Sequence, residues 1–289
     1  MSAWEIRSRI VGPATIRTED VGDGVTRIAV ATRVTRLNGM VACLYRLGGL
    51  LVDTGFSHAR RPIVEHLEGR EIEAIACTHH HEDHTGNADV LARRHGCPVY
   101  LRNAGCSREE GVVDLLPYRR WFWGPLDGFE YEEMPVRVEV AGRSMVPVPI
   151  PGHSVTHTAF HEPSTGVVLV GDLFVSPGVT AVMTHENPFA SIDSLRRVAA
   201  LSPSRMLTGH GLIVEDPAAA LGEKADRIEE AARGVLEMHG RGLSEGAIVR
   251  RTFKDGWSKD LNLRIATQDE FHRRNFVRAC IRHAPGEVS

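Results

Sequence analysis

One short stretch of the chain, residues 78–86, contains four side chains that could bind a metal ion. They are His79, His81, Asp83 and His84. On an extended segment, His79 and His81 project to the same side, while His80 projects to the other. The next two ligands come where a helix would begin, and adjacent helical side chains diverge by about 100°. The stretch therefore offers ligands for two ions, with a solvated histidine-rich turn as the alternative.

Three further donors each follow a short apolar run and have a glycine next to them. They are His153 after residues 147–151, Asp172 after 167–170 and His210 after 205–207. A neighbouring glycine lets the backbone approach an ion closely, and open α/β sheets gather their sites at the carboxyl ends of strands. Zinc accepts imidazole and carboxylate ligands, and a catalytic zinc keeps one position open for water. We therefore expect these donors to complete a dinuclear metal site.

The order of these residues resembles the metallo-β-lactamase superfamily of hydrolases, in which His-x-His-x-Asp-His is followed by His, Asp and His. The resemblance covers residues 20–214 and favours the glyoxalase II-like or thioesterase-like branch. It implies one ion bound by His79, His81 and His153, and another bound by Asp83, His84 and His210. It also implies that Asp172 bridges the ions and that Asp53 supports the site without binding metal. Thr156 stands where the family often has glycine, which leaves the path of that loop open.

The reaction that this resemblance implies is hydrolysis. A water held between two divalent ions loses its proton near neutral pH, because a single zinc lowers the pKa of bound water from 15.7 to roughly 7. The bridging hydroxide is the expected nucleophile, with Asp172 spacing the ions and Asp83 taking up the proton. We expect two divalent metal ions, zinc first, with iron or manganese as alternatives because their ligand types overlap.

An aromatic segment interrupts the regular pattern between residues 103 and 143. Its ring-bearing side chains are Tyr118, Trp121, Phe122 and Trp123. One interpretation is a plug that covers the edge of the sheets. The other is a lid or pocket wall that excludes water and receives the apolar or acyl part of the substrate. We expect Arg119 and Arg120, in the same segment, to be a solvated pair, with contact to a carboxylate or phosphate as the alternative.

Strands and helices alternate on both sides of the predicted ligands. The expected strands are 24–32, 39–47, 50–53, 72–77, 98–101, 147–151, 167–170 and 205–207. The expected helices are 60–68, 87–95 and 191–201, the last with Ser191 as its N-cap. We expect residues 1–23 to form an extended arm and 185–188 a surface turn, with a place at the mouth of the site as the alternative for 185–188. The resemblance assembles these elements as an α/β fold, a four-layer αβ/βα sandwich with a C-terminal helical extension.

The pattern becomes helical near residue 215. We therefore expect a catalytic domain at 1–214 and a helical appendage at 215–289, with helices at 218–239 and 244–252. Thr267 to Glu270 has the pattern of a capping box that opens a last helix. The tail resembles the appendage of some thioesterases and of an endoribonuclease relative, where it shapes the substrate entrance. A cap over an exposed core face is the alternative.

The composition is that of an ordinary globular protein, with 289 residues, 42% of them hydrophobic, a formal net charge of -3 and a pI near 6.6. This charge gives no bulk attraction to nucleic acid or to an anionic membrane. The five cysteines are odd in number and form no CxxC pair, which favours a reducing interior. Since no apolar run approaches the roughly 20 residues of a membrane span, we expect a cytoplasmic protein without a membrane partner.

The expected partner is a small-molecule acyl substrate, a thioester or an ester, because the aromatic segment suggests an apolar acyl site. Lactone hydrolysis is one alternative. Phosphodiesterase or endoribonuclease action is another, guided by basic residues of the tail: Arg233, Arg241, Arg250, Arg251 and Lys254. A non-catalytic binding module is a third. The sequence leaves open a homo-oligomer, the natural substrate and whether the aromatic segment moves.

Overall fold

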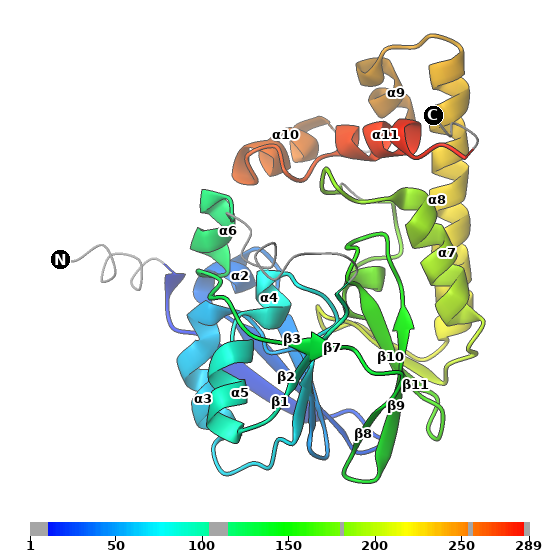
Figure 1. Ribbon diagram of the computed structural model, residues 1–289. Helices are drawn as coiled ribbons and strands as arrows, with labels where there is room; N and C mark the ends of the chain where they lie inside the picture. Colours follow the sequence, from blue (N-terminus) through cyan, green and yellow to red (C-terminus); the bar gives the residue numbers. More distant parts are fainter. Residues whose placement is uncertain (1–10, 104–114, 180–181, 254–256, 286–289) are drawn as a thin grey trace, which may run out of the picture.

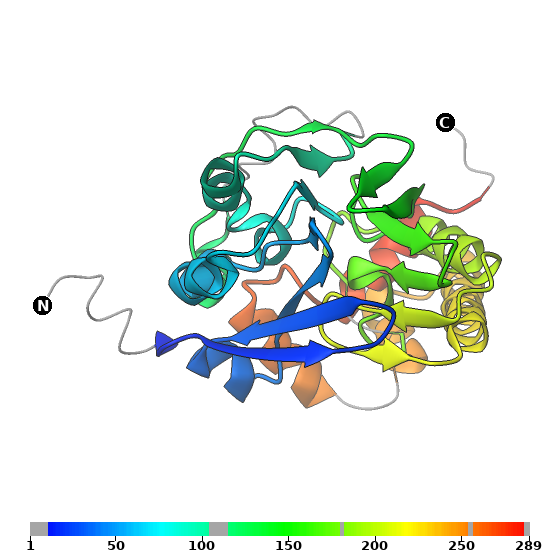
Figure 2. The same cartoon turned by 90° about the horizontal axis from the view of Figure 1, so that it is seen from below.

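Two mixed β-sheets face each other, and helices cover the outer side of each sheet (Figures 1 and 2). The computed structural model describes residues 11–103, 115–179, 182–253 and 257–285. Apolar side chains fill the space between the sheets and the two spaces between a sheet and its helices. The expected four-layer αβ/βα sandwich with C-terminal helices is therefore confirmed.

The first sheet contains seven strands in chain order. They are β1 (Thr15–Asp20), β2 (Val25–Ala31), β3 (Ala42–Leu47), β4 (Leu50–Val52), β5 (Ala74–Ala76), β6 (Val99–Leu101) and β7 (Glu132–Glu133). β1 to β4 pair antiparallel, and β4 to β7 pair parallel. In β3, Leu44 packs toward the helices, while Cys43 and Tyr45 pack toward the other sheet. Successive side chains of a strand alternate between its faces, so a strand buried on both faces is apolar throughout.

The second sheet contains six strands. In sheet order they are β13 (Ile213–Val214), β12 (Arg205–Leu207), β11 (Val167–Leu169), β10 (Thr158–Glu162), β9 (Arg143–Pro149) and β8 (Val138–Val140). Only β11 and β12 pair parallel; the other neighbours are antiparallel. Val167 and Leu169 of β11 face the first sheet, and Val168 faces the outer helices.

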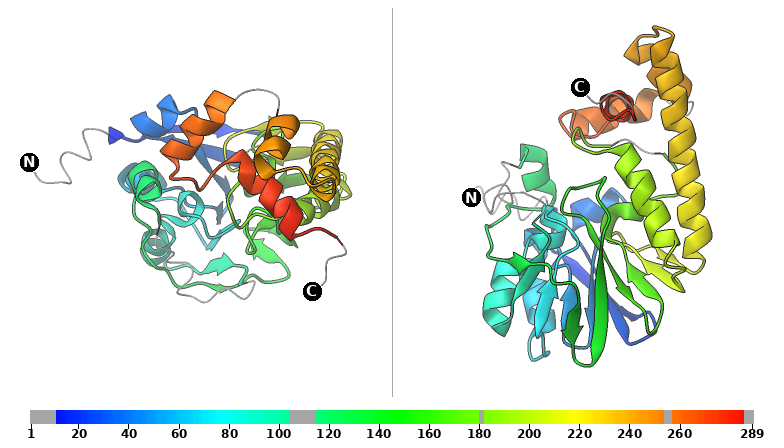
Figure 3. Two further views of the ribbon diagram at one scale, coloured as in Figure 1. Left: turned by 90° about the horizontal axis from the view of Figure 1, so that it is seen from above. Right: turned by 45° about the vertical axis from the view of Figure 1, so that its right-hand side comes forward.

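Helices cover the outer faces and one edge of the sandwich. The longer ones are α3 (Arg60–Leu67), α5 (Ala88–His95), α7 (Pro188–Ala199), α8 (Pro217–Gly240), α9 (Glu245–Thr252), α10 (Trp257–Ala266) and α11 (Arg273–Arg282). The shorter ones are α2 (Arg33–Leu37), η1 (Ser57–Ala59), α4 (Glu82–Thr85), α6 (Pro117–Phe122) and η2 (Gly171–Phe174). α3 and α5 lie on the first sheet, and α7 and α8 lie on the second (Figure 1). α8 extends past the end of the sandwich, and α10 and α11 lie across the upper edge of the sandwich (Figure 3).

Two expectations about helix and strand ends are wrong. Part of the expected N-terminal arm is β1, which pairs with β2 from Thr15 opposite Ala31 onward. Its side chains are mostly exposed, so no hydrophobic alternation marks it in the sequence. α7 begins before Ser191, because the Asn187 side chain accepts hydrogen bonds from the backbone N–H groups of Phe189 and Ala190. Asparagine at the N-cap followed by proline is a favoured helix start.

The predicted capping box at the last helix is also wrong. His272 caps α11, and its Nδ1 accepts a hydrogen bond of 2.9 Å from the backbone N–H of Arg274. Thr267 Oγ1 instead donates to the carbonyl of Leu263 at 2.8 Å, at the end of α10. Glu270 lies between the two helices and pairs with Arg119 of α6. The residues that resemble a cap therefore join the tail to the aromatic segment.

The tail and the sandwich share one apolar core. Leu195 of α7, Leu221 of α8 and Phe276 of α11 belong to the same buried cluster. The division into domains at residues 214 and 215 stays a prediction. Within the part of the chain that the structure describes, no helix is long and apolar enough to cross a membrane.

Candidate metal centre

All the predicted metal ligands lie together at one edge of the sandwich. They follow the carboxyl ends of strands: the turn with the first four follows β5, His153 follows β9, Asp172 follows β11 and His210 follows β12. Their donor atoms form two groups, within each of which the atoms lie no more than 4.8 Å apart. One group is His79, His81 and His153; the other is Asp83, His84, Asp172 and His210. We call them the first and second clusters.

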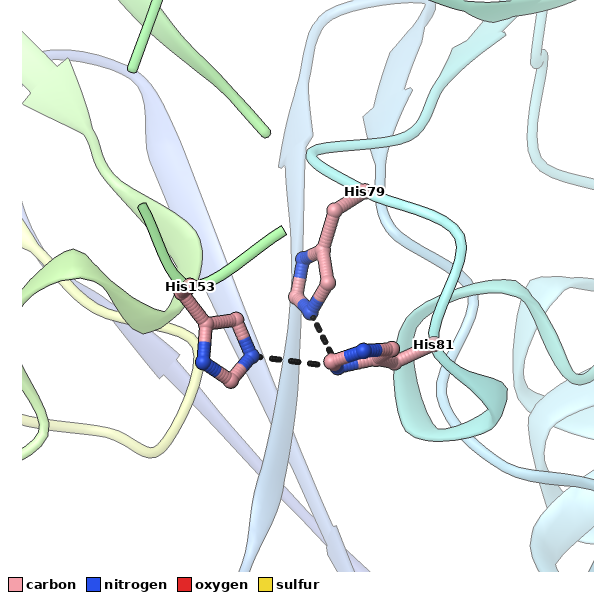
Figure 4. Close-up of side chains that lie close together, drawn as sticks. All are labelled: His79, His81 and His153. Carbon is pink, nitrogen blue, oxygen red and sulfur yellow. Dashed lines mark hydrogen bonds between the residues drawn. The ribbon is translucent and has the colours of Figure 1, made fainter. Parts of the chain in front are cut away.

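The first cluster joins the two halves of the sandwich. Figure 4 shows His79 and His81 on the turn after β5, with His153 approaching from the opposite side. Both His79 Nε2 and His153 Nε2 lie 3.0 Å from His81 Nδ1. Three nitrogens therefore converge on one point, an arrangement that leaves a fourth position for water on a zinc ion.

The carboxylate of Asp172 contacts both clusters. Its Oδ2 lies 3.2 Å from His210 Nε2 and 3.6 Å from His153 Nε2. Its Oδ1 lies 3.3 Å from His84 Nε2. Asp83 Oδ2 closes the second cluster, 3.6 Å from His84 Nε2 and 3.8 Å from His210 Nε2. The carboxylate of Asp172 thus lies between the two clusters, and its role as a bridge between two ions stays a prediction.

Asp53, at the end of β4, supports the site without belonging to either cluster. Its carboxylate accepts a hydrogen bond of 2.7 Å from the backbone N–H of Thr78 and lies 2.8 Å from His84 Nδ1. The backbone of Asp53 has a φ of 60°, in the left-handed region that few non-glycine residues occupy. The carboxylate thus fixes the start of the ligand turn and orients the His84 ring.

Glycine beside a ligand matters most at Gly209. A Cβ built at this position would lie 2.6 Å from Asp172 Oδ1 and 2.6 Å from His84 Cε1. Any side chain would therefore displace the second cluster. On the other side of the site, Thr156 replaces the glycine of the family pattern and forms a hydrogen bond of 2.9 Å with His80 Nδ1. His80 thus joins the loop after β9 to the ligand turn and, as expected, lies in neither cluster.

The electrostatics of the centre suit a cation. Burial lowers the pKa of His79 and of His81 well below the usual value, so these imidazoles are neutral and offer lone pairs near pH 7. Burial also disfavours protonation of His84, but nearby carboxylates, that of Asp83 first, outweigh it and raise the pKa well above the usual value. His84 Nε2 and Asp172 Oδ1 are buried without a hydrogen-bond partner. A cation between these two atoms would satisfy both, so the residues fit a bound metal.

Two residues lie behind the ligands: His157 was missed from the sequence, and Glu186 was placed near the site only as an alternative. His157 is fully buried, and its Nε2 accepts a hydrogen bond of 3.3 Å from the backbone N–H of Asp172. In the sequence, its position four residues after His153 was the available sign that it lies near the site. Glu186 Oε2 lies 3.5 Å from His153 Nδ1, and its Oε1 accepts a hydrogen bond of 2.8 Å from the backbone N–H of Met183. The expectation of a surface turn at 185–188 is therefore wrong.

Replacing Glu186 with glutamine removes the negative charge beside His153 and keeps the length of the side chain. Because such a carboxylate orients a metal-bound histidine and raises its basicity, we expect affinity for the ion of the first cluster to fall about 10- to 100-fold. Competition with a chromophoric chelator measures this affinity. Asp193→Asn, at an exposed position of α7, is the matched control and should change nothing. Equal affinities of wild type and Glu186→Gln would remove Glu186 from the metal site.

The aromatic segment forms one wall of a chamber beside both clusters. The chamber has a volume of about 410 Å³. Its lining includes Tyr118, Trp121, Phe122 and Trp123, together with His81, Asp83, His153, Asp172 and His210. Trp123 is also buried against Phe56, and its ring stacks on that of His210 with centroids 6.4 Å apart. Trp123 thus packs in the core, and all four residues line this aromatic chamber; that the segment receives part of a substrate stays a prediction.

Arg119 is buried, which makes the expectation of a solvated pair wrong for this residue; Arg120 is exposed. Arg119 Nε and Nη2 each donate to Glu82 at 2.6 Å, and Nη1 donates to Glu270 at 3.1 Å. Glu82 is the residue between the candidate metal ligands His81 and Asp83. Arg119 therefore joins the ligand turn, the aromatic segment and the tail.

Residues 45–210 match the family model described as the metallo-beta-lactamase superfamily. Because this match covers more than half of the chain, the chain belongs to that superfamily. Its candidate metal centre consists of two clusters typical of the dinuclear site of this superfamily.

Among curated proteins, the chain is similar to hydroxyacylglutathione hydrolases. That of Chromohalobacter salexigens is 31% identical over 171 residues, which are 56% of this chain and 56% of that protein. That of Cereibacter sphaeroides is 32% identical over 152 residues, which are 52% of this chain and 53% of that protein. The chain spans about half the length of the curated relatives it matches.

Solved structures with the same fold match most of the chain. A beta-lactamase domain protein from Burkholderia ambifaria superposes with a TM-score of 0.66 at 19% identity, covering 92% of this chain and 88% of that one. A metallo-beta-lactamase family protein from Thermus thermophilus has a TM-score of 0.56 at 19% identity, covering 92% and 91%. At such identities the likeness shows the fold alone.

Proposed function

We propose that this protein hydrolyses a small thioester or ester. The observation that carries the proposal is the aromatic chamber, whose surface is mainly apolar and which opens directly on both clusters. Such a chamber suits the apolar part of a small substrate. The similarity to hydroxyacylglutathione hydrolases, whose name describes a thioester reaction, supports the same bond class.

The residues would hold two divalent ions, zinc first, with iron or manganese as alternatives because their ligands overlap. His79, His81 and His153 would hold one ion, Asp83, His84 and His210 the other, and Asp172 would contact both. When bound, such ions supply Lewis acidity, which polarises the substrate carbonyl and makes water a nucleophile near neutral pH.

The protein's own groups position the substrate and move the proton. The rings of Trp121 and Phe122 form the apolar wall that excludes water from the reacting bond. Asp83 also lines this chamber, so its carboxylate can accept the proton that water loses and return it to the leaving group. Asp53 and Glu186 hold the rings of His84 and His153 in the orientations described above.

The alternative of a phosphodiesterase or endoribonuclease depends on basic residues of the tail. Arg233, Arg241, Arg250 and Arg251 are exposed, and none of these described residues lines the aromatic chamber. Lys254 lies outside the described residues. Lactones stay within the proposal's range, because their ring-opening is hydrolysis of an ester. We therefore place thioesters and esters first.

A panel of substrates with zinc-loaded protein tests the proposal. It contains acyl-glutathione and acyl-coenzyme A thioesters, aryl esters, lactones and bis(p-nitrophenyl) phosphate. We expect kcat/KM of about 10⁴ M⁻¹ s⁻¹ or more on at least one thioester or ester, the lower end of the ordinary enzyme range. A chelator should abolish this turnover, and added zinc should restore it. Faster cleavage of the phosphodiester, or ester turnover that survives chelation, would overturn the proposal.

A further inference from the structure

A second chamber meets the metal centre from the side of α7 and α8. Its volume is about 270 Å³. It shares Met40, His153, Asp172, His210 and Phe271 with the aromatic chamber. Most of its other lining residues are apolar, among them Leu173, Val179, Val182, Leu195 and Ile228. A substrate whose reacting bond lies at the clusters can therefore extend in two directions, into two chambers of different chemistry.

Lys224 of α8 brings a positive charge to the second chamber, which the carboxylates of Glu186 and Asp172 also line. It is the only Lys or Arg among the described residues that line this chamber, and it is 9% exposed. Its Nζ donates a hydrogen bond of 2.8 Å to the carbonyl of Ser176 and stands 4.9 Å from the centre of the Phe174 ring. The hydroxyl of Ser176 is itself buried without a hydrogen-bond partner. We call the second chamber the lysine chamber.

The ammonium group of Lys224 has no carboxylate partner within salt-bridge distance among the described residues. An ammonium has three donors, so neutral contacts with one carbonyl and one ring leave it incompletely satisfied. Burial lowers the pKa of Lys224 to about 8, while the charges of Glu186 and Asp172 oppose that shift. The group is therefore mostly protonated at pH 7.

The carboxylates that face the lysine chamber are already engaged. Glu186 lies against His153 Nδ1 and the backbone N–H of Met183. Asp172 belongs to the metal centre. Neither forms an ion pair with Lys224, so the lysine charge stays available to a group that enters from outside. The partner that best satisfies a desolvated ammonium is an anion with hydrogen-bond acceptors.

We propose that the lysine chamber binds a carboxylate carried by one half of the substrate, while the aromatic chamber takes the apolar half. This inference rests on the proposed function and specifies its substrate class as carboxylate-bearing thioesters or esters. The space is roughly the liquid volume of nine waters, which suits a short chain that ends in a carboxylate. The carboxylate can belong to the acyl group or to the leaving group, since both halves extend from the reacting bond.

Two matched substrate pairs distinguish a carboxylate on the acyl group from a carboxylate on the leaving group. The first compares glutaryl with valeryl thioesters of N-acetylcysteamine, and the second compares valeryl thioesters of 3-mercaptopropionate and 3-mercaptopropionamide. We expect wild type to prefer the charged member of one pair about 10- to 100-fold in kcat/KM. Lys224→Met should remove that preference and leave the neutral substrates within about twofold, whereas Lys224→Arg should keep part of it.

The matched control is Arg227→Met. Arg227 is an exposed residue of the same helix that donates to the neighbouring carbonyl, that of Pro177, at 3.1 Å and does not line the lysine chamber. Its replacement should leave the substrate preference unchanged. Equal slowing of charged and neutral substrates by Lys224→Met, or no charge preference in either pair, would overturn the proposal.

Thermal denaturation with added glutarate provides a readout without turnover. Glutarate should raise the Tm of wild type and of Arg227→Met, but not that of Lys224→Met. If glutarate raises the Tm of all three proteins equally, it binds elsewhere and the proposed carboxylate site in the lysine chamber is wrong. If wild type hydrolyses no ester or thioester while glutarate still stabilises it through Lys224, the proposed function fails and the carboxylate site stands.

Discussion

Asp172→Ala should lower kcat/KM on the best substrate by about 10³-fold and lower the metal content below two ions per chain. Asp172 is the residue whose carboxylate contacts His84, His153 and His210 together, so its loss affects both clusters. Stabilisation of transition-state charge by a metal ion amounts to several kcal/mol, and each 1.36 kcal/mol corresponds to a factor of ten in rate. Steady-state kinetics and elemental analysis of the same preparation measure both effects.

Asp172→Asn provides the comparison, because it keeps the size of the side chain and removes its charge. We expect it to retain more metal than Asp172→Ala and still to lose most of the activity. Asp193→Ala, at an exposed position of α7, should behave as wild type. If Asp172→Ala kept two ions and activity within tenfold of wild type, Asp172 would not bridge the clusters.

Arg119→Met should destabilise the protein by about 3–5 kcal/mol, because it leaves the carboxylate of Glu82 buried and unpaired. Glu82 is 1% exposed, and both of its oxygens accept hydrogen bonds of 2.6 Å from Arg119. For a chain of this size we expect the Tm to fall by about 10 °C. Urea unfolding of chelator-treated protein measures the change without a contribution from bound metal.

The double variant Arg119→Met with Glu82→Gln separates the charge from the packing. Once the buried carboxylate is removed, much of the lost stability should return, which a double-mutant cycle reports as a coupling energy. Arg120→Met is the matched control, because Arg120 is the exposed neighbour on the same helix. Additive effects of the two substitutions would show that the Arg119–Glu82 pair contributes no coupling.

The candidate ligands were accessible from the sequence because each follows an apolar strand, whereas their division between two ions was implied by the resemblance to the superfamily. The turn at residues 79–84 comes after β5, and Asp172 and His210 come after β11 and β12, which pair parallel. Strands that pair parallel bring their carboxyl ends to one edge, so local patterns determine a site built from distant residues. The layers of the fold follow from the same apolar strands and amphipathic helices.

The groups that surround the ligands could not be found in this way. Arg119 pairs with Glu82 and Glu270, which lie 37 and 151 residues away in the chain, and nothing local marks it as buried. Lys224 occupies a helix position next to buried Ala225, where sequence periodicity does not distinguish a chamber wall from a solvated edge. Such contacts depend on how α6, α8 and the tail pack together, which hydrophobic spacing alone does not determine.

Elemental analysis of purified, zinc-loaded and dialysed protein tests the dinuclear centre most directly. Wild type should retain two ions per chain, whereas His153→Ala and His210→Ala, one from each cluster, should each retain about one. No more than a trace of transition metal in wild type, or an unchanged metal content in both variants, would contradict a centre formed by these two clusters.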